Sequence, residues 1–174
     1  MGNTRLAEAL AITVDEAKQF KLSFMQKYSK IDDFIDKTID NLKINGYIEM
    51  ISHRRRLLPN IHSNDETLLS KARRQATHSV IQGSAADCIK LAMIAVDSAI
   101  RKSGFDASLI LQIHDELMYE VRNDDTVDDQ HTPIEFARLL KNQMENVSKH
   151  LKVILPVKVQ TGSSWGDLTE LKDL

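Results

Sequence analysis

Apolar residues in the first 45 positions recur at the three- and four-residue spacing of amphipathic helices. A short helix is expected around Leu6–Leu10. The tetrad Thr13-Val14-Asp15-Glu16 is typical of a capping box, because the Thr13 hydroxyl and the Glu16 carboxylate can satisfy backbone amides at a helix start. A helix is therefore predicted to follow, with one face formed by Ala17, Phe20, Phe24 and Tyr28.

A second helix and a hairpin are predicted next. The helical spacing continues over about residues 31–43, and Asn45-Gly46 predicts the end of the helix and the start of a turn. Two short strands are expected at Tyr47–Ile51 and Arg56–Leu58. Pro59 should end their pairing, because proline cannot donate a hydrogen bond to a neighbouring strand.

The centre of the chain combines a long helical pattern with a second hairpin. Asn64-Asp65 opens the helical pattern, Gly83 is expected to interrupt it, and a second helix is expected over residues 85–102. Leu109–Gln112 and Leu117–Val121 resemble strands, and the ionisable residues 114–116 lie between them.

The last part should add a helix and a strand. Pro133 suits the first turn of a helix that runs to about His150, and Pro156–Gln160 alternates like a strand. The order of elements predicts an α+β fold, with helices packed on a small antiparallel sheet. We place an approximate boundary between residues 80 and 81. A solvated acidic loop is expected at Asp124, Asp125, Asp128 and Asp129.

Composition narrows the class of protein. A net charge of −2 over 174 residues excludes a highly basic protein that coats nucleic acid, but it leaves room for a local basic groove. The single cysteine, Cys88, cannot form a disulfide within the chain, so a reducing compartment is expected and a core role is favoured over a reactive thiol. We find no apolar run long enough to cross a bilayer and no secretory signal, so no membrane partner is expected.

The triplet His114-Asp115-Glu116 concentrates ionisable groups where a hairpin tip usually carries Asn-Gly or Asp-Gly. Adjacent carboxylates repel each other unless a cation compensates. Mg²⁺ suits such oxygens, since it takes one or two protein carboxylates and completes its shell with water and substrate phosphates. Spacing alone favours an ordinary solvated turn, and the triplet lacks the ligand count of a zinc site.

Four segments in order resemble motifs of the family A DNA polymerases, the bacterial polymerase I class. The similarity covers nearly the whole chain, and it implies a partial fingers subdomain over residues 1–80 and a C-terminal palm portion over 81–174. Two of the segments, Gln82–Asp87 and Ser164-Trp165-Gly166, are most similar to the eukaryotic theta and nu repair branch. The four segments are Arg54–Pro59, Arg74-Gln75-Ala76 with Gln82–Asp87, Gln112–Leu117 and Gly162–Gly166.

The resemblance implies template-directed nucleotidyl transfer from a dNTP to a primer 3′-hydroxyl by two Mg²⁺ ions, in DNA repair synthesis. It assigns Asp115 as a metal ligand and Glu116 as an auxiliary catalytic carboxylate. A eukaryotic protein of this kind would act in the nucleus, and a bacterial one in the cytoplasm.

The resemblance also implies contacts to primer-template DNA. His114 would contact the primer terminus, and Arg74 and Gln82 would face the minor groove of the new duplex. Arg54 and Arg55 would hold the primer strand, with Arg56 beside them, because guanidinium groups stay charged and fork onto phosphate. Without the resemblance, solvated surfaces are the favoured interpretation of these charges. The chain departs from the family pattern at His53, Leu57, Arg73 and His78, the last standing where an Asn would contact the template side.

Several parts of the family's site have no counterpart in the chain: the first-motif Asp, the nucleotide-binding helix and the thumb. The polypeptide alone is therefore expected to be inactive, and its catalytic hairpin is expected to expose an edge and apolar surface that lower solubility. Two alternatives stay open. One is a non-catalytic module that binds primer-template DNA, and the other is a structural or regulatory helical domain that merely resembles the family.

Overall fold

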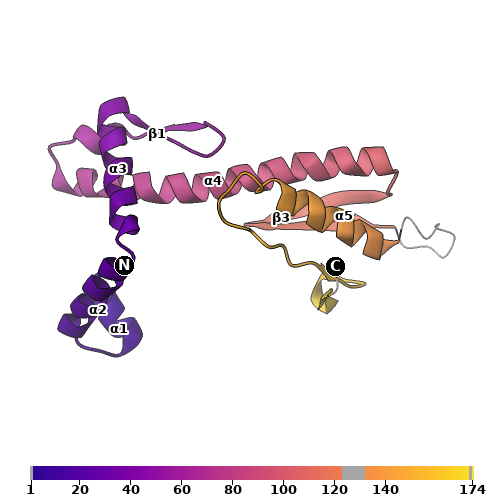
Figure 1. The fold of residues 1–174 in the computed structure, drawn as a ribbon, viewed down its shortest axis with the longest axis horizontal. Coiled ribbons are helices and arrows are strands. Elements are labelled where there is room, and N and C mark those ends of the chain that lie inside the picture. The colour runs from indigo at the N-terminus through magenta and orange to yellow at the C-terminus, as the bar shows by residue number, and fades with distance from the viewer. Residues whose placement is uncertain (1, 123–131, 173) are drawn as a thin grey trace. The chain divides into compact units, whose positions relative to one another are not determined.

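The structure, a computed structural model, describes residues 2–122, 132–172 and 174 (Figure 1). The chain forms two compact units, residues 1–81 and 82–174. Their assignment as fingers and palm stays a prediction, and the expected acidic loop lies outside the described residues. Helices and small antiparallel sheets make up the fold, which confirms the α+β class.

Three helices open the first unit: α1 (Asn3–Leu10), α2 (Val14–Lys27) and α3 (Lys30–Asn45). The capping box is confirmed, since the Glu16 amide donates to the Thr13 hydroxyl at 3.2 Å and the Thr13 amide donates to the Glu16 carboxylate at 2.8 Å. Hydrogen bonds donated to the Glu16 carboxylate, first by the Thr13 amide and then by the Thr13 hydroxyl at 2.8 Å, hold the pKa of Glu16 below its ordinary value.

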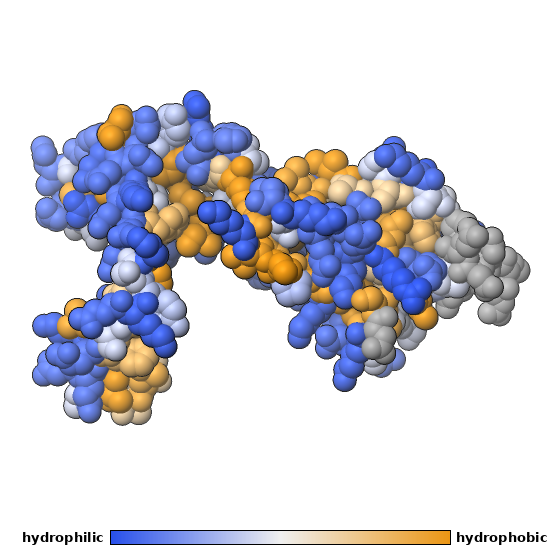
Figure 2. Space-filling model, in the orientation of Figure 1, coloured by the Kyte–Doolittle hydropathy of each residue, from blue (hydrophilic) through white to orange (hydrophobic). Residues whose placement is uncertain are grey.

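Only part of the expected apolar face of α2 is buried. Ala17 is fully buried, but the aromatic residues of that face stay 44–55% exposed. Spacing identifies which residues share a face, but it does not show that a neighbour covers that face. Figure 2 shows apolar side chains at the surface of both units. The exposed aromatic residues of α2 are Phe20, Phe24 and, at its end, Tyr28.

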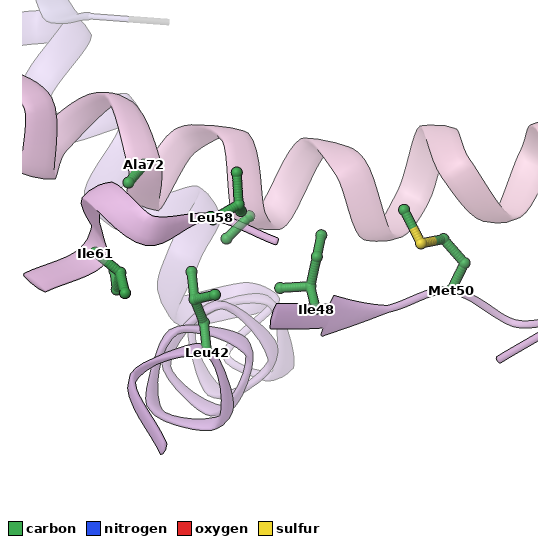
Figure 3. Close-up of a cluster of buried hydrophobic side chains, with 7 residues drawn as sticks. Leu42, Ile48, Met50, Leu58, Ile61 and Ala72 are labelled. Atoms are coloured by element: carbon green, nitrogen blue, oxygen red, sulfur yellow. The ribbon is translucent and has the colours of Figure 1, made fainter. Parts of the chain in front are cut away.

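The core of the first unit lies between α3, a hairpin and the first turns of α4 (Glu66–Ser103) (Figure 3). The hairpin pairs β1 (Tyr47–Glu49) with β2 (Arg55–Leu57), and the 3₁₀ helix η1 (Pro59–His62) follows. In Figure 3, Ile48 and Met50 point toward α4. The buried members of this core are Leu42, Ile48, Met50, Leu58, Ile61, Ala72 and Ala76.

The first strand of this hairpin is shorter than predicted, because the turn already begins at Met50, and the second is shifted by one residue toward the turn. The Met50 amide donates to the Arg54 carbonyl at 2.9 Å, and the His53 amide donates to the Met50 carbonyl at 3.0 Å. His53 has a φ of 62°, a value that glycine adopts more readily.

Helix α4 is continuous, so the prediction that Gly83 interrupts it is wrong. Asp65 caps the helix, because its carboxylate accepts from the Thr67 amide at 2.7 Å. Glycine costs a helix interior about 1 kcal/mol, which tertiary packing overrides here. Ala76 and Ala92, on either side of Gly83, are both buried.

By length and composition, helix α4 is long and apolar enough to cross a bilayer. It is the one such helix among those that the structure describes. The expectation that no apolar run reaches this length is therefore wrong. Core helices of soluble proteins meet the same criterion. Ala76 and Val96 of α4 are fully buried in the protein's own cores, whereas 22% of the most apolar stretch of α4 is buried.

The second unit packs a hairpin and a helix against the later turns of α4. The hairpin pairs β3 (Ala107–Ile113) with β4 (Glu116–Val121), and α5 (Pro133–Asn146) lies beside them (Figure 1). The core is formed by Val96, Phe136 and Leu140. The ring of Tyr119 lies edge-on to the ring of Phe136, with 5.5 Å between the ring centres. Helix α5 ends at Asn146, earlier than the expected His150.

The predicted strand Pro156–Gln160 is wrong except at its last residue. The Val157 amide donates to the Glu145 carboxylate of α5 at 3.0 Å, and only at Val159 does the segment meet the chain beside β6, where the Val159 carbonyl accepts from the Leu171 amide at 2.9 Å. The C-terminal segment instead forms β5 (Gln160–Thr161) and β6 (Thr169–Glu170), with the 3₁₀ helix η3 (Trp165–Asp167) between them.

The β3–β4 hairpin exposes apolar surface, as expected for a sheet with free edges. Among the described strands, β3 and β4 pair only with each other. Ile110 is 56% exposed, and Leu109 and Leu111 are exposed at about 40% each. Long exposed apolar edges favour association between chains, so the low solubility stays a prediction with a structural reason.

Replacing Leu42 by alanine should destabilise the first unit by about 2–5 kcal/mol, because a fully buried leucine leaves a cavity when it is truncated. Ile44 lies on the same helix and is 80% exposed, so Ile44→Ala should change stability by less than about 0.5 kcal/mol. Urea unfolding followed by circular dichroism compares the two. Equal losses for both variants would contradict the described core.

Tyr119 should resist ionisation, because burial, with a smaller contribution from the charge of Asp97, raises its pKa to about 12. The folded state holds this proton more tightly than the unfolded chain does. The resulting stability is complete below pH of about 10 and is lost as the pH rises through about 12. In an ultraviolet titration, Tyr119→Phe should remove a phenolate transition centred near 12. If the transition that Tyr119→Phe removes is instead centred near pH 10, the result would contradict this packing.

Candidate functional site

The tip of the β3–β4 hairpin is a two-residue turn formed by His114 and Asp115. Ile113 and Glu116 are the last paired residues, so the turn is one residue shorter than the predicted triplet. His114 takes a φ of 51°, which supplies the positive φ that glycine usually provides. The Gln112 side-chain amide donates to the His114 carbonyl at 3.0 Å and ties the turn to β3.

A bulge in β3 lies on the approach to this turn, and the sequence pattern did not reveal it. The register shifts between Leu109 and Leu111, so Ile110 is the extra residue. Bulges bend a strand and increase its twist, and they recur beside functional sites because they redirect side chains. The unbroken apolar run over residues 109–111, which lacks the alternation of a regular strand, was the available signal.

The carboxylates of Asp115 and Glu116 stand exposed at the hairpin tip, one in the turn and one at the start of β4. Within residues 2–122, 132–172 and 174, no three His, Cys, Asp or Glu side chains come together as a set of metal ligands. The two carboxylates therefore fit Mg²⁺ as hard oxygen donors, but they are too few for a site made of protein ligands alone. Water and substrate phosphates would have to complete the coordination.

The arginines of the β1–β2 hairpin have different surroundings. The Arg55 Nε donates to the Glu49 carboxylate at 3.3 Å, and its guanidinium lies 4.5 Å from the centre of the Tyr47 ring. His53 Nδ1 lies 2.7 Å from the same carboxylate. Hydrogen bonds from His53 and then Arg55 hold the pKa of Glu49 below its ordinary value. Arg54 is exposed at the turn.

Arg56 is turned the other way. Its Nη1 donates to the hydroxyl of Ser79 on α4 at 2.6 Å, and Ser79 is only 5% exposed. Sequence reasoning missed this contact. The available signal was strand alternation, because Arg56 lies opposite Ile48, whose side chain belongs to the core.

Helix α4 carries the remaining candidates. Arg74 and His78 are separated by one helical turn and both are exposed, in the first unit. Gln82 is exposed one further turn along and begins the second unit. The structure thus divides the predicted site: Arg54, Arg55, Arg74 and His78 belong to the first unit, and Gln82, His114, Asp115 and Glu116 to the second. Their roles stay predictions.

Comparison with known proteins identifies the chain's relatives. The sequence profile of DNA polymerase family A matches residues 1–167. The chain belongs to this family. DNA polymerase I of Borreliella burgdorferi is 37% identical over 168 residues, which cover 97% of this chain and 18% of that protein. DNA polymerase theta of Drosophila melanogaster is 35% identical and is covered over 8% of its length.

A solved structure agrees with the family assignment. The POL domain of Pol1 from M. smegmatis, in complex with DNA primer-template and dNTP, is similar with a TM-score of 0.73 and 34% identity. The match covers 84% of this chain and 24% of that one. The chain therefore spans less than a quarter of each family A relative compared. Because the bacterial and theta relatives are 37% and 35% identical, the theta or nu branch stays a prediction.

The closing segment of this family A chain contains a glycine that its surroundings require. A Cβ on Gly162 would collide with the Asp167 carbonyl group, whereas a Cβ on Gly166 would meet nothing within 4 Å. The backbone of the β5–β6 turn approaches Gly162 too closely for any side chain. Trp165, between them in sequence, is 61% exposed.

Changing His114 should test the geometry of the candidate metal-binding tip. His114→Val should cost about 1–3 kcal/mol, because a β-branched residue is strained at positive φ. His114→Asn and His114→Gly should stay within about 1 kcal/mol of the original chain, since both residues tolerate this region. Denaturant unfolding of the three variants measures the difference. A valine variant as stable as the asparagine variant would contradict the described turn.

Proposed function

We propose that this chain is the part of a template-directed DNA polymerase that brings the Asp115-Glu116 carboxylate pair to the primer terminus. The observation that carries the proposal is the exposure of both carboxylates at a two-residue tip between paired strands. Family membership across residues 1–167 supports it. So does the likeness to a polymerase domain whose title names DNA primer-template and dNTP.

In the proposed reaction, Asp115 holds a Mg²⁺ ion, Glu116 supports the site as a second carboxylate, and His114 contacts the primer end. Bound Mg²⁺ would supply charge stabilisation and a lowered pKa for the attacking hydroxyl. The residues of the chain itself hold the two carboxylates in place. Paired strands on both sides of the turn, and the Gln112 hydrogen bond to the His114 carbonyl, restrict where the carboxylates can lie.

We propose that exposed residues of α4 and the β1–β2 turn bind the duplex. Arg74 and His78 lie four residues apart in the first unit, so they share one face of α4, and Gln82 is exposed in the second unit. Arg54 would reach the primer strand from the turn. Arg55 would do so only in competition with Glu49, whose carboxylate already accepts its Nε hydrogen.

Catalysis needs more than these residues supply. The hairpin tip supplies two carboxylates, and a two-metal site with a bound triphosphate needs further ligands. We therefore propose that the 174-residue polypeptide does not polymerise by itself and that the missing ligands come from other parts of a family A polymerase. A role in DNA repair, and a nuclear location, follow only if the chain belongs to the theta or nu branch.

A primer-extension assay on a chimera tests the proposal. In the chimera, this chain replaces the matching segment of the Borreliella burgdorferi DNA polymerase I. Asp115→Asn should lower kcat by ~10²–10³-fold, or about 3–4 kcal/mol, because a metal ligand stabilises charge in the transition state. Glu120→Gln, an exposed carboxylate farther along β4, is the matched control and should change kcat less than about twofold.

Undiminished extension by the Asp115→Asn chimera would refute the metal role. The 174-residue chain itself should give no template-dependent product with Mg²⁺ and nucleotides. Product from that chain would refute the proposed dependence on other polymerase parts.

A second candidate function is a non-catalytic module that binds primer-template DNA. The absence of a three-ligand metal cluster among the described residues, together with the exposed Arg54, Arg74 and His78, favours it for the chain alone. Binding through phosphates releases counterions, so affinity should fall steeply with salt. Duplex binding by a chain whose chimera does not extend primers would favour this function over catalysis.

A further inference from the structure

The three consecutive arginines of the β1–β2 hairpin do not point in the same direction. The register pairs Glu49 with Arg55 and Ile48 with Arg56. Residues directly opposite each other in a pair of strands place their side chains on the same face. Because Ile48 is only 4% exposed, Arg56 leaves β2 on the same face as this core residue, although Arg56 itself stays exposed, as does all of β2. Arg55 leaves on the other face, where Glu49 and the Tyr47 ring surround it.

On that inner face Arg56 has a specific partner. Its Nη1 lies 2.6 Å from the hydroxyl of Ser79, and 23 positions separate the two residues along the chain. A guanidinium is always charged, so this is a charge-assisted hydrogen bond with a fixed direction. Ser79 is 5% exposed and lies on α4 next to His78. The bond therefore joins the hairpin to the part of α4 that presents the candidate DNA contacts.

The core alone would hold the hairpin less strictly. Apolar contacts such as those of Ile48 and Met50 stabilise the base of the hairpin without directional preference. The turn that carries Arg54 begins directly after Met50. A directional bond from the neighbouring strand limits how that turn can rotate against the helix.

We propose that Arg56 and Ser79 are positioning residues. Their hydrogen bond holds the β1–β2 hairpin on α4, so that Arg54 meets the phosphates of a primer-template duplex together with Arg74 and His78. Arg56 itself does not contact phosphate. The inference rests on the proposed binding of DNA, and it concerns the first unit alone.

The test uses the 174-residue chain and a fluorescently labelled primer-template duplex, with anisotropy measured over a range of KCl concentrations. Arg56→Met keeps the length of the side chain and removes the donor, and Ser79→Ala removes the acceptor without changing charge. Each should weaken binding about 3–10-fold, and the double variant should bind no more weakly than Arg56→Met. Ser79→Thr keeps a hydroxyl and should bind within about twofold of the original chain.

The salt dependence separates positioning from direct contact. A phosphate contact by Arg56 predicts that Arg56→Met lowers the slope of log affinity against log salt by about 1 while Ser79→Ala has no effect. That result would overturn the proposal. Arg101→Met, an exposed arginine of α4 in the second unit that pairs with Asp97, removes the same charge and should leave affinity unchanged.

All binding is measured at a temperature where circular dichroism shows every variant folded. If the Ser79→Ala variant has a lower unfolding midpoint but binds the duplex as tightly as the original chain, the bond is merely structural and the proposal is overturned. Additive losses in the double variant would do the same. A chain that binds no duplex at low salt would instead refute the proposed DNA binding itself, and the positioning role would fall with it. If the original chain binds the duplex but the effects of the Arg56 and Ser79 substitutions are independent, only the positioning role is refuted.

Discussion

Burial of small side chains along α4 is the constraint on which both units depend. Ala72 and Ala76 are 1% and 0% exposed in the first unit, and Ala92 and Val96 are equally buried in the second. Alanine has no atoms beyond Cβ, so neighbouring elements can approach the helix backbone closely and pack at the density of a protein interior. The β1–β2 hairpin and the later β3–β4 hairpin each use this helix as the wall of their core.

Identical residue types acquire different roles because of the face on which a strand places them. Arg55 lies between Glu49 and the Tyr47 ring, where it is partly neutralised, whereas Arg56 reaches a buried hydroxyl on another element. A run of consecutive arginines in a hairpin therefore does not provide one phosphate contact for each arginine. Arg54 is exposed in the turn between the two strands.

The hairpin tip combines local strain with chemistry. His114 holds a positive φ and Asp115 and Glu116 follow it directly, so an unfavourable backbone conformation sets the position of two carboxylates. Under the proposed function, Mg²⁺ with substrate phosphates would complete a coordination shell that these two carboxylates begin. The chain spans less than a fifth of the Borreliella and Drosophila relatives.

The sequence by itself determined features whose partners are close along the chain. The capping box at Thr13 and Glu16, the end of α3 at Gly46, and the position of the ionisable tip all follow from interactions within a few residues. The family motifs were also readable, because they depend on residue identity and order. The boundaries of α3, β3 and β4 lie within a few residues of those predicted for the same reason.

Only the tertiary structure decided features whose partners are distant. Helix α4 continues through Gly83 because buried neighbours outweigh a weak local propensity, and Val157 joins no strand because its amide meets Glu145 of α5. Tyr119 gains its raised pKa from burial, which no local pattern reveals. The bond between Arg56 and Ser79 depends on which face of β2 meets α4. Long-range packing sets these outcomes, and a linear pattern of residues does not specify which surfaces will meet.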